Sequence, residues 1–408
     1  MSKAALWNWA GAAAVAVIAV AAIASTHGLS IGLAGLSRTA AVVASAPARP
    51  VVIGVAVGLT GANSIVAPTV VQSSQLAVDE INRTGGILGR PVELAVADDG
   101  SGPVGVPNAA QQLIDQRHAD VVIAMETSAA RTAMLPLIER ARIPYIYTSF
   151  YEGHACSPWM YANGWVPEQQ VVPIVHYLMQ DKAARNIFLV GSDYAFGRGM
   201  LAFTRRYIES HGGHVAGEEY LPIANTDWSL VVARIRSAKP DALVSATAGG
   251  TPNLTLVRQL DAAGIRLPYG NLAIDESTAQ AMGERATGML MSASYLTSIE
   301  SRENHDFLTG MLIKFGAGLQ APNELSVPQY EAIHLYRAAA ERAGTTDSLR
   351  VLAALGAVTF DGPRGLVQMS ASHHTALAMR LGRVQTDGSV RVLQTFGNTD
   401  PGAQCPGL

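Results

Sequence analysis

Small hydroxyl and aromatic residues recur where strand-like runs of the chain end and helical runs begin. Five such loops carry Ser, Thr, Gly or Tyr, namely 58–63, 126–128, 147–151, 192–196 and 248–251. Hydroxyls both donate and accept hydrogen bonds, and Tyr adds a flat ring, so these loops have the chemistry to bind a small polar molecule. Helix capping and turn formation explain any one loop taken alone. The recurrence over five loops favours a binding cleft.

Catalytic and metal-binding motifs are missing from the sequence. It has no Gly-x-x-x-x-Gly-Lys phosphate loop, no Gly-x-Gly-x-x-Gly after the first strand, no Gly-x-Ser-x-Gly elbow and no His-Glu-x-x-His. The pair His373-His374 is the best metal candidate, but neighbouring residues on a strand point to opposite faces. Asp98-Asp99 resembles a carboxylate pair, although a turn before Gly-Ser-Gly also explains it. We therefore expect no enzyme, no metal and no cofactor.

Strand and helix signals alternate along most of the chain. The pattern predicts strands at 51–57, 91–97, 120–125, 143–148, 186–191, 242–247 and 290–295. It predicts helices at 72–83, 109–116, 130–141, 167–180, 200–211 and 254–263. Regular alternation indicates an α/β protein of mostly parallel sheets flanked by helices, in which ligands bind beyond the carboxyl ends of the strands.

Composition and the N-terminal segment narrow the class of protein. The 408 residues are 49% hydrophobic and 15% charged with a net charge of −3, which gives no electrostatic footprint for nucleic acid or for an anionic membrane surface. Lys3, the uncharged run 10–24 and small-residue sites after it are typical of a secretory signal. A second Ala-rich stretch, 29–48, leaves an uncleaved anchor open. Residues 1–50 are thus predicted to be a signal peptide or N-terminal anchor plus linker of an exported protein.

Only two cysteines occur, Cys156 and Cys405. In an oxidising compartment they could form one bridge, but the sequence alone does not bring them within reach of each other, so two free thiols are an equal alternative.

Many motifs in order along the chain resemble one family. Gly58-Leu-Thr-Gly, the helix ending Ala77-Val-Asp-Glu-Ile-Asn and Gly85-Gly-Ile-Leu-Gly-Arg-Pro-Val resemble type I periplasmic solute-binding proteins of the branched-chain amino acid ABC transporter class. Further motifs resemble the amide- and urea-binding branch: Tyr151-Glu-Gly, Pro167-Glu-Gln-Gln, Gly191-Ser-Asp-Tyr and Phe360-Asp-Gly-Pro-Arg-Gly. The likeness extends from about residue 51 to 396.

The resemblance implies a two-lobed fold with a ligand cleft between the lobes, each lobe being a mostly parallel sheet flanked by helices. Lobe 1 would comprise 51–170 and 297–372, and lobe 2 would comprise 171–296 and 373–400. Residues 401–408 would form a C-terminal tail.

The resemblance also implies which positions meet the ligand. The amide-binding pattern falls on Ser128, Tyr147, Ser149 and Tyr194. Glu276 occupies a lobe 2 loop where the family often has a polar residue facing the ligand, although an acid in the first turn of a helix explains it as well. The full set of candidate ligand-binding residues is Glu126, Thr127, Ser128, Tyr147, Ser149, Tyr194, Phe196, Gly249 and Glu276.

Two of these positions depart from the family pattern. Glu126 stands where the amide and urea binders usually have an aromatic residue, and Phe196 where some relatives have a second Tyr. Because a carboxylate in an enclosed cleft is unfavourable unless paired, we expect Glu126 to meet an amino, amidine or guanidine-type group of the ligand, or Arg131 on the helix that follows.

The predicted function is capture of a small polar solute, such as urea, a short amide or an amino-acid-like molecule, for delivery to an ABC transporter permease. The alternative is a sensor or regulatory protein that responds to an amide or amino acid. The N-terminal apolar segment favours the exported receptor, because a cytoplasmic regulator needs none. The expected partners are the solute and the permease subunits, with no nucleic acid, and with membrane contact only through the permease or an uncleaved N-terminal segment.

Overall fold

A computed structural model describes residues 49–406. The predicted signal or anchor segment therefore lies outside the described residues except for its last two positions. Within the described part, no helix is both long and apolar enough to cross a membrane.

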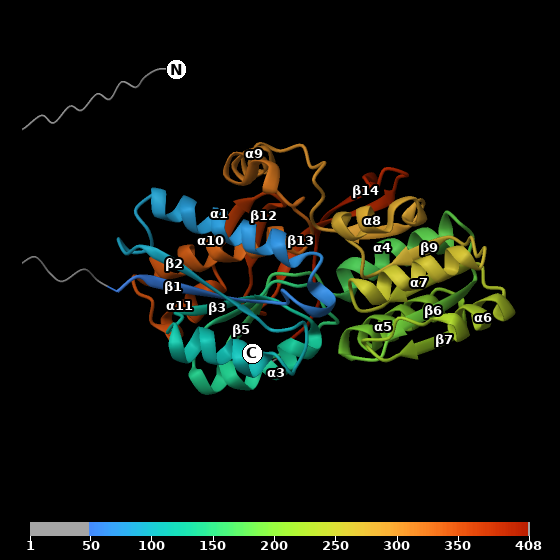
Figure 1. The fold of residues 1–408 in the computed structure, drawn as a ribbon, viewed down its shortest axis with the longest axis horizontal. Coiled ribbons are helices and arrows are strands. Elements are labelled where there is room, and N and C mark those ends of the chain that lie inside the picture. Colours follow the sequence, from blue (N-terminus) through green and yellow to red (C-terminus); the bar gives the residue numbers. More distant parts are fainter. Residues whose placement is uncertain (1–48, 407–408) are drawn as a thin grey trace, which may run out of the picture. The chain divides into compact units, whose positions relative to one another are not determined.

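One lobe is built on a five-stranded parallel sheet, and we call it lobe 1 (Figure 1). Its strands, in the spatial order β2-β1-β3-β4-β5, are β1 (Val51–Val57), β2 (Val92–Asp98), β3 (Val121–Met125), β4 (Tyr145–Tyr147) and β5 (Met160–Ala162). Every residue of β1 and β3 is buried, as expected for strands covered on both faces. The helices of lobe 1 are α1 (Ala67–Arg83), α2 (Val106–Ala110) with a π-helical continuation over Gln111–Gln116, α3 (Ser128–Ala141), α9 (Arg302–Phe315), α10 (Ser326–Ala343) and α11 (Ser348–Leu355).

Lobe 2 is built on a nine-stranded mixed sheet in the order β11-β12-β13-β10-β9-β8-β6-β7, with β14 also paired to β13. Its strands are β6 (Asn186–Ser192), β7 (His214–Leu221), β8 (Ala242–Ala246), β9 (Tyr269–Asn271), β10 (Leu290–Ala293), β11 (Thr359–Gly362), β12 (Gly365–Met369), β13 (Thr375–Val384) and β14 (Val390–Thr399). Strands β6 to β10 are parallel, and the pairs that involve β11 to β14 are antiparallel. The helices are α4 (Pro167–Gln180), α5 (Ala195–Ser210), α6 (Ser229–Ala238), α7 (Thr251–Ala262) and α8 (Glu276–Met282).

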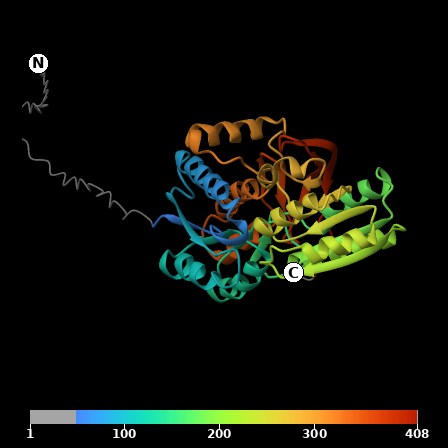
Figure 2. The same ribbon diagram turned by 45° about the vertical axis from the view of Figure 1, so that its right-hand side comes forward.

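Three segments connect the two lobes, which lie side by side in both views (Figures 1 and 2). The first, 163–166, joins β5 to α4, and the second, 294–301, joins β10 to α9. The third, 356–374, leads from α11 of lobe 1 to β13 of lobe 2 and includes the β11–β12 hairpin, which extends the sheet of lobe 2. The predicted two-lobed α/β fold is confirmed. The residue boundaries that we assign to the lobes remain a prediction, because the β11–β12 hairpin, which packs against α10 of lobe 1, is also hydrogen-bonded to β13 through Gln368 and Met369.

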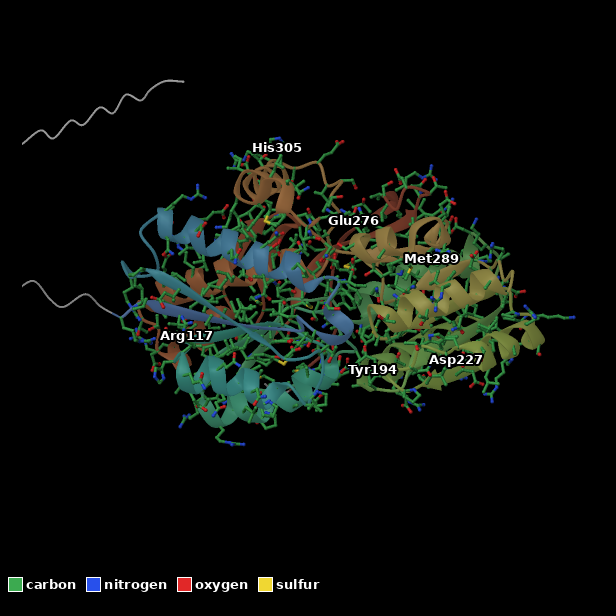
Figure 3. The ribbon with its side chains drawn as sticks, in the orientation of Figure 1. Arg117, Tyr194, Asp227, Glu276, Met289 and His305 are labelled. Carbon is green, nitrogen blue, oxygen red and sulfur yellow. A yellow bond between two sulfur atoms is a disulfide. The ribbon has the colours of Figure 1, made fainter. Side chains whose placement is uncertain are left out.

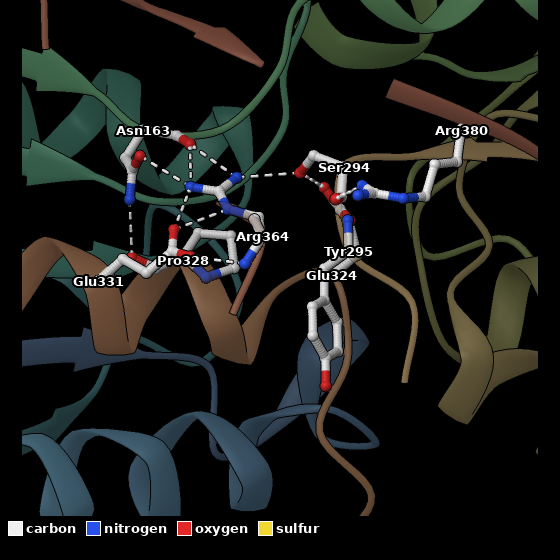
Figure 4. A network of polar contacts seen from close by, with 8 residues as sticks. All are labelled: Asn163, Ser294, Tyr295, Glu324, Pro328, Glu331, Arg364 and Arg380. Carbon is white, nitrogen blue, oxygen red and sulfur yellow. Dashed lines mark hydrogen bonds and ion pairs between the residues drawn. The ribbon is translucent and has the colours of Figure 1, made fainter. Parts of the chain in front are cut away.

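A buried ion pair holds the connecting segments together (Figure 4). Arg364, at the tip of the β11–β12 hairpin, binds Glu331 on α10 at 2.6 Å, and both side chains are almost inaccessible to solvent. The same guanidinium donates to the Asn163 side chain at 2.8 Å, in the first connecting segment, and to Ser294 Oγ at 2.9 Å, in the second. Ser294 Oγ in turn donates to Glu324 Oε1 at 2.5 Å. One guanidinium thus fixes two of the three connections.

Cys156 and Cys405 are joined in a disulfide, which settles the alternatives left open by the sequence in favour of the bridge. The bond fastens the C-terminal tail to the loop that follows β4. Gln404 adds to this attachment by accepting a hydrogen bond from the backbone N–H of His154 at 3.1 Å.

Replacing Arg364 with Met should lower the free energy of unfolding by about 3–5 kcal/mol, because Glu331 would keep a buried charge with no counter-charge. Denaturant unfolding followed by circular dichroism measures this change. Arg266→Met is the matched control, since the Arg266–Asp261 pair is solvent-exposed and should be worth about 1 kcal/mol or less. Equal effects of the two substitutions would contradict a special role for Arg364.

Candidate functional site

A cavity of about 50 Å³ lies where the two lobes meet, at the carboxyl ends of strands from both sheets. That volume corresponds to roughly three to five water-sized spheres. The lining residues are Ala62, Asn63, Ile65, Val66, Met125, Glu126, Thr127, Ser128, Tyr147, Ser149, Phe150, Tyr194, Phe196, Thr247, Gly249, Gly250, Ala273, Asp275, Thr278 and Leu325. This is the position at which parallel α/β sheets bind ligands.

The structure brings all but one of the predicted site residues to this cavity. Glu126, Thr127, Ser128, Tyr147, Ser149, Tyr194, Phe196 and Gly249 line it. Figure 3 shows Tyr194 where the two lobes meet. The exception is Glu276, which is not among the lining residues. Its carboxylate accepts hydrogen bonds from the backbone and the hydroxyl of Thr297, both at 2.8 Å, so it is bound to the second connecting segment. Its neighbour Asp275 lines the cavity instead.

Three buried polar atoms of the cavity wall accept no hydrogen bond from a backbone N–H group or a side-chain hydroxyl, amide or guanidinium group of the described residues. They are Glu126 Oε2 and Ser149 Oγ from lobe 1 and Thr247 Oγ1 from lobe 2. Each such atom costs about 1–3 kcal/mol when it is left without a partner, so the cavity is built to be filled by something with matching polar groups.

Two other hydroxyls of the wall are already used by the protein. Ser128 Oγ donates to Glu152 Oε2 at 2.5 Å, and Glu152 Oε1 accepts from Arg131 at 2.5 Å. Thr127 Oγ1 caps α3 by accepting from the Ala130 N–H at 3.1 Å. The Thr127 hydroxyl also donates to the Ser101 carbonyl oxygen at 3.2 Å. Both hydroxyl protons are therefore occupied, and a solute would meet these residues through their remaining lone pairs.

The expectation that Glu126 pairs with Arg131 is wrong. Arg131 instead binds Glu152, and its guanidinium carbon lies over the rings of Tyr147 and Tyr151 at 5.1 and 4.6 Å from their centroids. Glu152 comes from a loop 21 residues away along the chain, which spacing on the helix could not reveal.

Glu126 is instead hydrogen-bonded to other acidic groups. Its Oε1 accepts a hydrogen bond from the Tyr145 hydroxyl, and its carboxyl group lies within hydrogen-bonding reach of Asp99, at the end of β2. Burial, and then the charge of Asp99, raise the pKa of Glu126 well above its ordinary value. Burial also raises the pKa of Asp99 to about 6, although the hydrogen bond that Asp99 accepts from the Ser101 N–H at 2.6 Å opposes this shift. Two buried carboxyl groups this close favour sharing one proton, because two neighbouring negative charges in a buried site are costly.

Aromatic rings cover one side of the cavity and span the junction. The ring of Phe196 in lobe 2 lies 6.0 Å from that of Tyr194 and 5.7 Å from that of Phe150 in lobe 1. Phe150 is stacked on Trp165 of the first connecting segment at 4.2 Å. This arrangement provides flat surfaces for a planar solute.

Two glycines allow α5 to approach this site closely. A Cβ on Gly197 would stand 2.0 Å from the Ser192 carbonyl oxygen, and one on Gly199 would stand 2.4 Å from Cβ of Glu152 in lobe 1. Glycine at position 199 is therefore what lets lobe 2 reach the Glu152 loop of lobe 1.

Four important residues of the wall were missed by sequence reasoning: Asn63, Phe150, Thr247 and Asp275. Asn63 and Phe150 lie inside loops that the sequence had already singled out. Thr247 follows the apolar run of β8 directly and was included in the predicted strand.

The described residues contain no group of three or more His, Cys, Asp or Glu that could hold a metal ion. The His373 ring is stacked on Tyr161 at 4.0 Å, and the His374 ring is hydrogen-bonded to the Tyr151 hydroxyl. Both histidines therefore have structural partners.

Comparison with known proteins identifies the family. A sequence model described as "Periplasmic binding protein" matches residues 50–389, and the chain belongs to this family, in the type I class of branched-chain amino acid transporters. Members of this class are substrate-binding proteins of transporters rather than enzymes, and the family implies a periplasmic location.

Two similar curated proteins are named as Leu/Ile/Val-binding proteins. "Leu/Ile/Val-binding protein homolog 6" of Brucella melitensis is 24% identical over 310 residues, which are 72% of this chain and 78% of that protein. "Leu/Ile/Val-binding protein BraC3" of Rhizobium johnstonii is 25% identical over 362 residues, which are 82% of this chain and 95% of that protein.

Solved structures share the fold at low sequence identity. A solute-binding protein from R. palustris in complex with 4-hydroxybenzoate superposes with a TM-score of 0.79 at 22% identity, covering 87% of this chain and 99% of that one. A branched-chain amino acid transporter substrate-binding protein from Streptococcus pneumoniae in complex with isoleucine superposes with a TM-score of 0.74 at 22% identity, covering 85% and 99%.

Asp99→Asn should change the pH dependence of stability. The pKa of Asp99 is about 6 in the folded protein against an ordinary 3.8, so the folded state binds this proton more tightly than the unfolded chain does. The contribution of Asp99 is therefore fully present below about pH 4 and is lost as pH rises through 6, by about 3 kcal/mol.

The expected result is that Asp99→Asn gains stability relative to the wild type between about pH 4 and pH 7, measured by urea unfolding at each pH. Asp115→Asn, at an exposed position, is the control for the loss of one carboxyl group. A difference between Asp99→Asn and the wild type that does not vary with pH would contradict the raised pKa.

Proposed function

We propose that this substrate-binding protein captures a small polar solute of the urea, short-amide or amino-acid-like kind between its lobes and delivers it to an ABC transporter permease. The observation that carries the proposal is the set of three unpartnered buried polar atoms, two from lobe 1 and one from lobe 2, around one cavity. A solute that satisfies all three at once binds both lobes and so favours the closed arrangement.

Cavity size is compatible with a small solute, because the cavity has room for only a few water-sized spheres. Similar solved structures contain 4-hydroxybenzoate and isoleucine. The motifs of the amide- and urea-binding branch point in the same direction. Mass spectrometry of the molecule that copurifies with the protein under native conditions tests this proposal directly, and a copurified long-chain or aromatic acid would contradict it.

Delivery of the solute to the permease depends on closure of the two lobes around it. The permease must distinguish the loaded protein from the empty one, and surfaces of both lobes approach each other only when the solute bridges them. The loop of Glu152 and helix α5 are in contact in this structure, so closure brings these elements together.

Tyr194→Ala should weaken solute binding about tenfold or more, which corresponds to about 1.4 kcal/mol, because the ring forms part of the cavity wall in lobe 2. Isothermal titration calorimetry with the copurified solute measures the dissociation constant. The control is Tyr207→Ala. Tyr207 lies in α5, the helix that Tyr194 precedes, and is stacked on His211 rather than lining the cavity, so this substitution should leave the dissociation constant unchanged. An unaltered dissociation constant for Tyr194→Ala would remove this ring from the site.

Gly199→Ala should also weaken binding about tenfold, although Ala is the better helix former. Its methyl group would collide with Glu152 and hold the lobes apart. The matched control is Gly397→Ala in β14, where an added Cβ meets nothing within 4 Å. Small-angle scattering with and without solute should show that Gly199→Ala fails to contract; normal contraction would refute the close approach as a condition for closure.

A further inference from the structure

The cavity wall carries an acidic pair. Glu126 lines the cavity with 1% of its surface exposed, and Asp99, which is fully buried, is its neighbour. One oxygen of each, Glu126 Oε2 and Asp99 Oδ2, accepts no hydrogen bond from any N–H or O–H group of the described residues. The proton that the two carboxyl groups share occupies one lone pair of an accepting oxygen, so the Glu126 carboxyl group, which lines the cavity, keeps further acceptor lone pairs for a solute.

Among the described residues, no Lys, Arg or His forms an ion pair with Glu126 or Asp99. Among the residues that line the cavity none is Lys, Arg or His, and the lining acids are Glu126 and Asp275. Asp275 is compensated locally, because it caps α8 by accepting from the N–H and the hydroxyl of Thr278 at 2.9 and 3.0 Å. Arg131, the nearest cation, is neutralised by Glu152.

The other titratable groups near Glu126 and Asp99 add no positive charge. Asp98, next to Asp99, is itself an acid, and its carboxylate is bound by Thr60 and the Gly100 N–H. Tyr145 and Tyr147 stay neutral, because burial raises the pKa of both hydroxyls. With one shared proton, the Glu126–Asp99 pair thus leaves one net negative charge beside an enclosed cavity, and such a charge is costly unless it is paired.

We propose that the solute carries a planar cationic nitrogen group, an amidinium or guanidinium, whose N–H groups bind Glu126 and whose charge balances the Glu126–Asp99 pair. The aromatic rings of Phe150, Tyr194 and Phe196 suit such a group, because flat cations also bind to ring faces. This inference rests on the proposed capture of a small polar solute. Within that function it makes the cationic analogues of urea and of short amides the preferred solutes, ahead of the neutral molecules.

Two pairs of probes of nearly equal shape test the inference. Guanidinium is compared with urea, and acetamidinium with acetamide, by isothermal titration calorimetry with the full-length protein at about pH 7.5. We expect each cation to bind about tenfold or more tightly than its neutral counterpart. The double substitution Asp99→Asn/Glu126→Gln, which keeps the shape of both side chains and removes their charge, should bring the ratio close to one.

The pH dependence of the wild-type protein gives a second measurement that needs no variant. Protonation of the pair below about pH 6 should reduce the preference for the cations, while binding of the neutral probes changes little. Glu276→Gln, which removes an acid of lobe 2 that lies outside the cavity, should leave the ratio unchanged.

The outcomes separate this inference from the proposed function. If urea or acetamide binds as tightly as its cationic counterpart, or if the preference persists in the double variant, the inference is overturned while capture of a small solute stands. If none of the four probes binds at millimolar concentration, the inference is overturned, whereas the proposed function is decided separately by the molecule that copurifies.

Discussion

The structure depends on one buried cation at the junction of the lobes. The Arg364 guanidinium has lost its water and must find all its hydrogen-bond acceptors in the protein. It finds them on Glu331 of lobe 1 and on Asn163 and Ser294 of two connecting segments. Hydrogen bonds are directional, so these contacts fix the two connecting segments relative to α10. The cavity, the aromatic rings around it and the contact of α5 with lobe 1 lie at the junction that these segments form.

Polar side chains of the site fall into two sets, those with hydrogen-bond or ion-pair partners within the protein and those without. Groups that shape the loops are fully paired, as Thr127, Ser128 and Arg131 are. Groups that face the cavity from opposite lobes, Ser149 and Thr247, are not. A protein that must hold and release a solute benefits from this division, because the loops keep their shape while the free energy of binding comes from the few atoms that the solute can satisfy.

Sequence reasoning succeeded where local periodicity and tertiary packing agree. The predicted first strand and the helix 167–180 have the bounds that β1 and α4 have in the structure. It failed where packing overrides the local pattern. Helix α5 begins at Ala195 rather than at residue 200, because Gly197 and Gly199, poor helix formers, are required by close contacts that only the folded protein contains. Eight of the nine candidate residues meet at one cavity, since strand order brings their loops together, whereas the direction of the Glu276 side chain depends on Thr297 in a separate segment.

The bond between Cys156 and Cys405 joins residues that are 249 positions apart, so nearly the whole described chain must be synthesised before it can close. Disulfides of this kind persist in oxidising compartments. A chain that crosses a membrane unfolded therefore travels with both thiols reduced, and oxidation afterwards acts as a final step of maturation. The disulfide that attaches the last described residues to the loop after β4 thus agrees with folding in an oxidising compartment, such as the periplasm that the family implies.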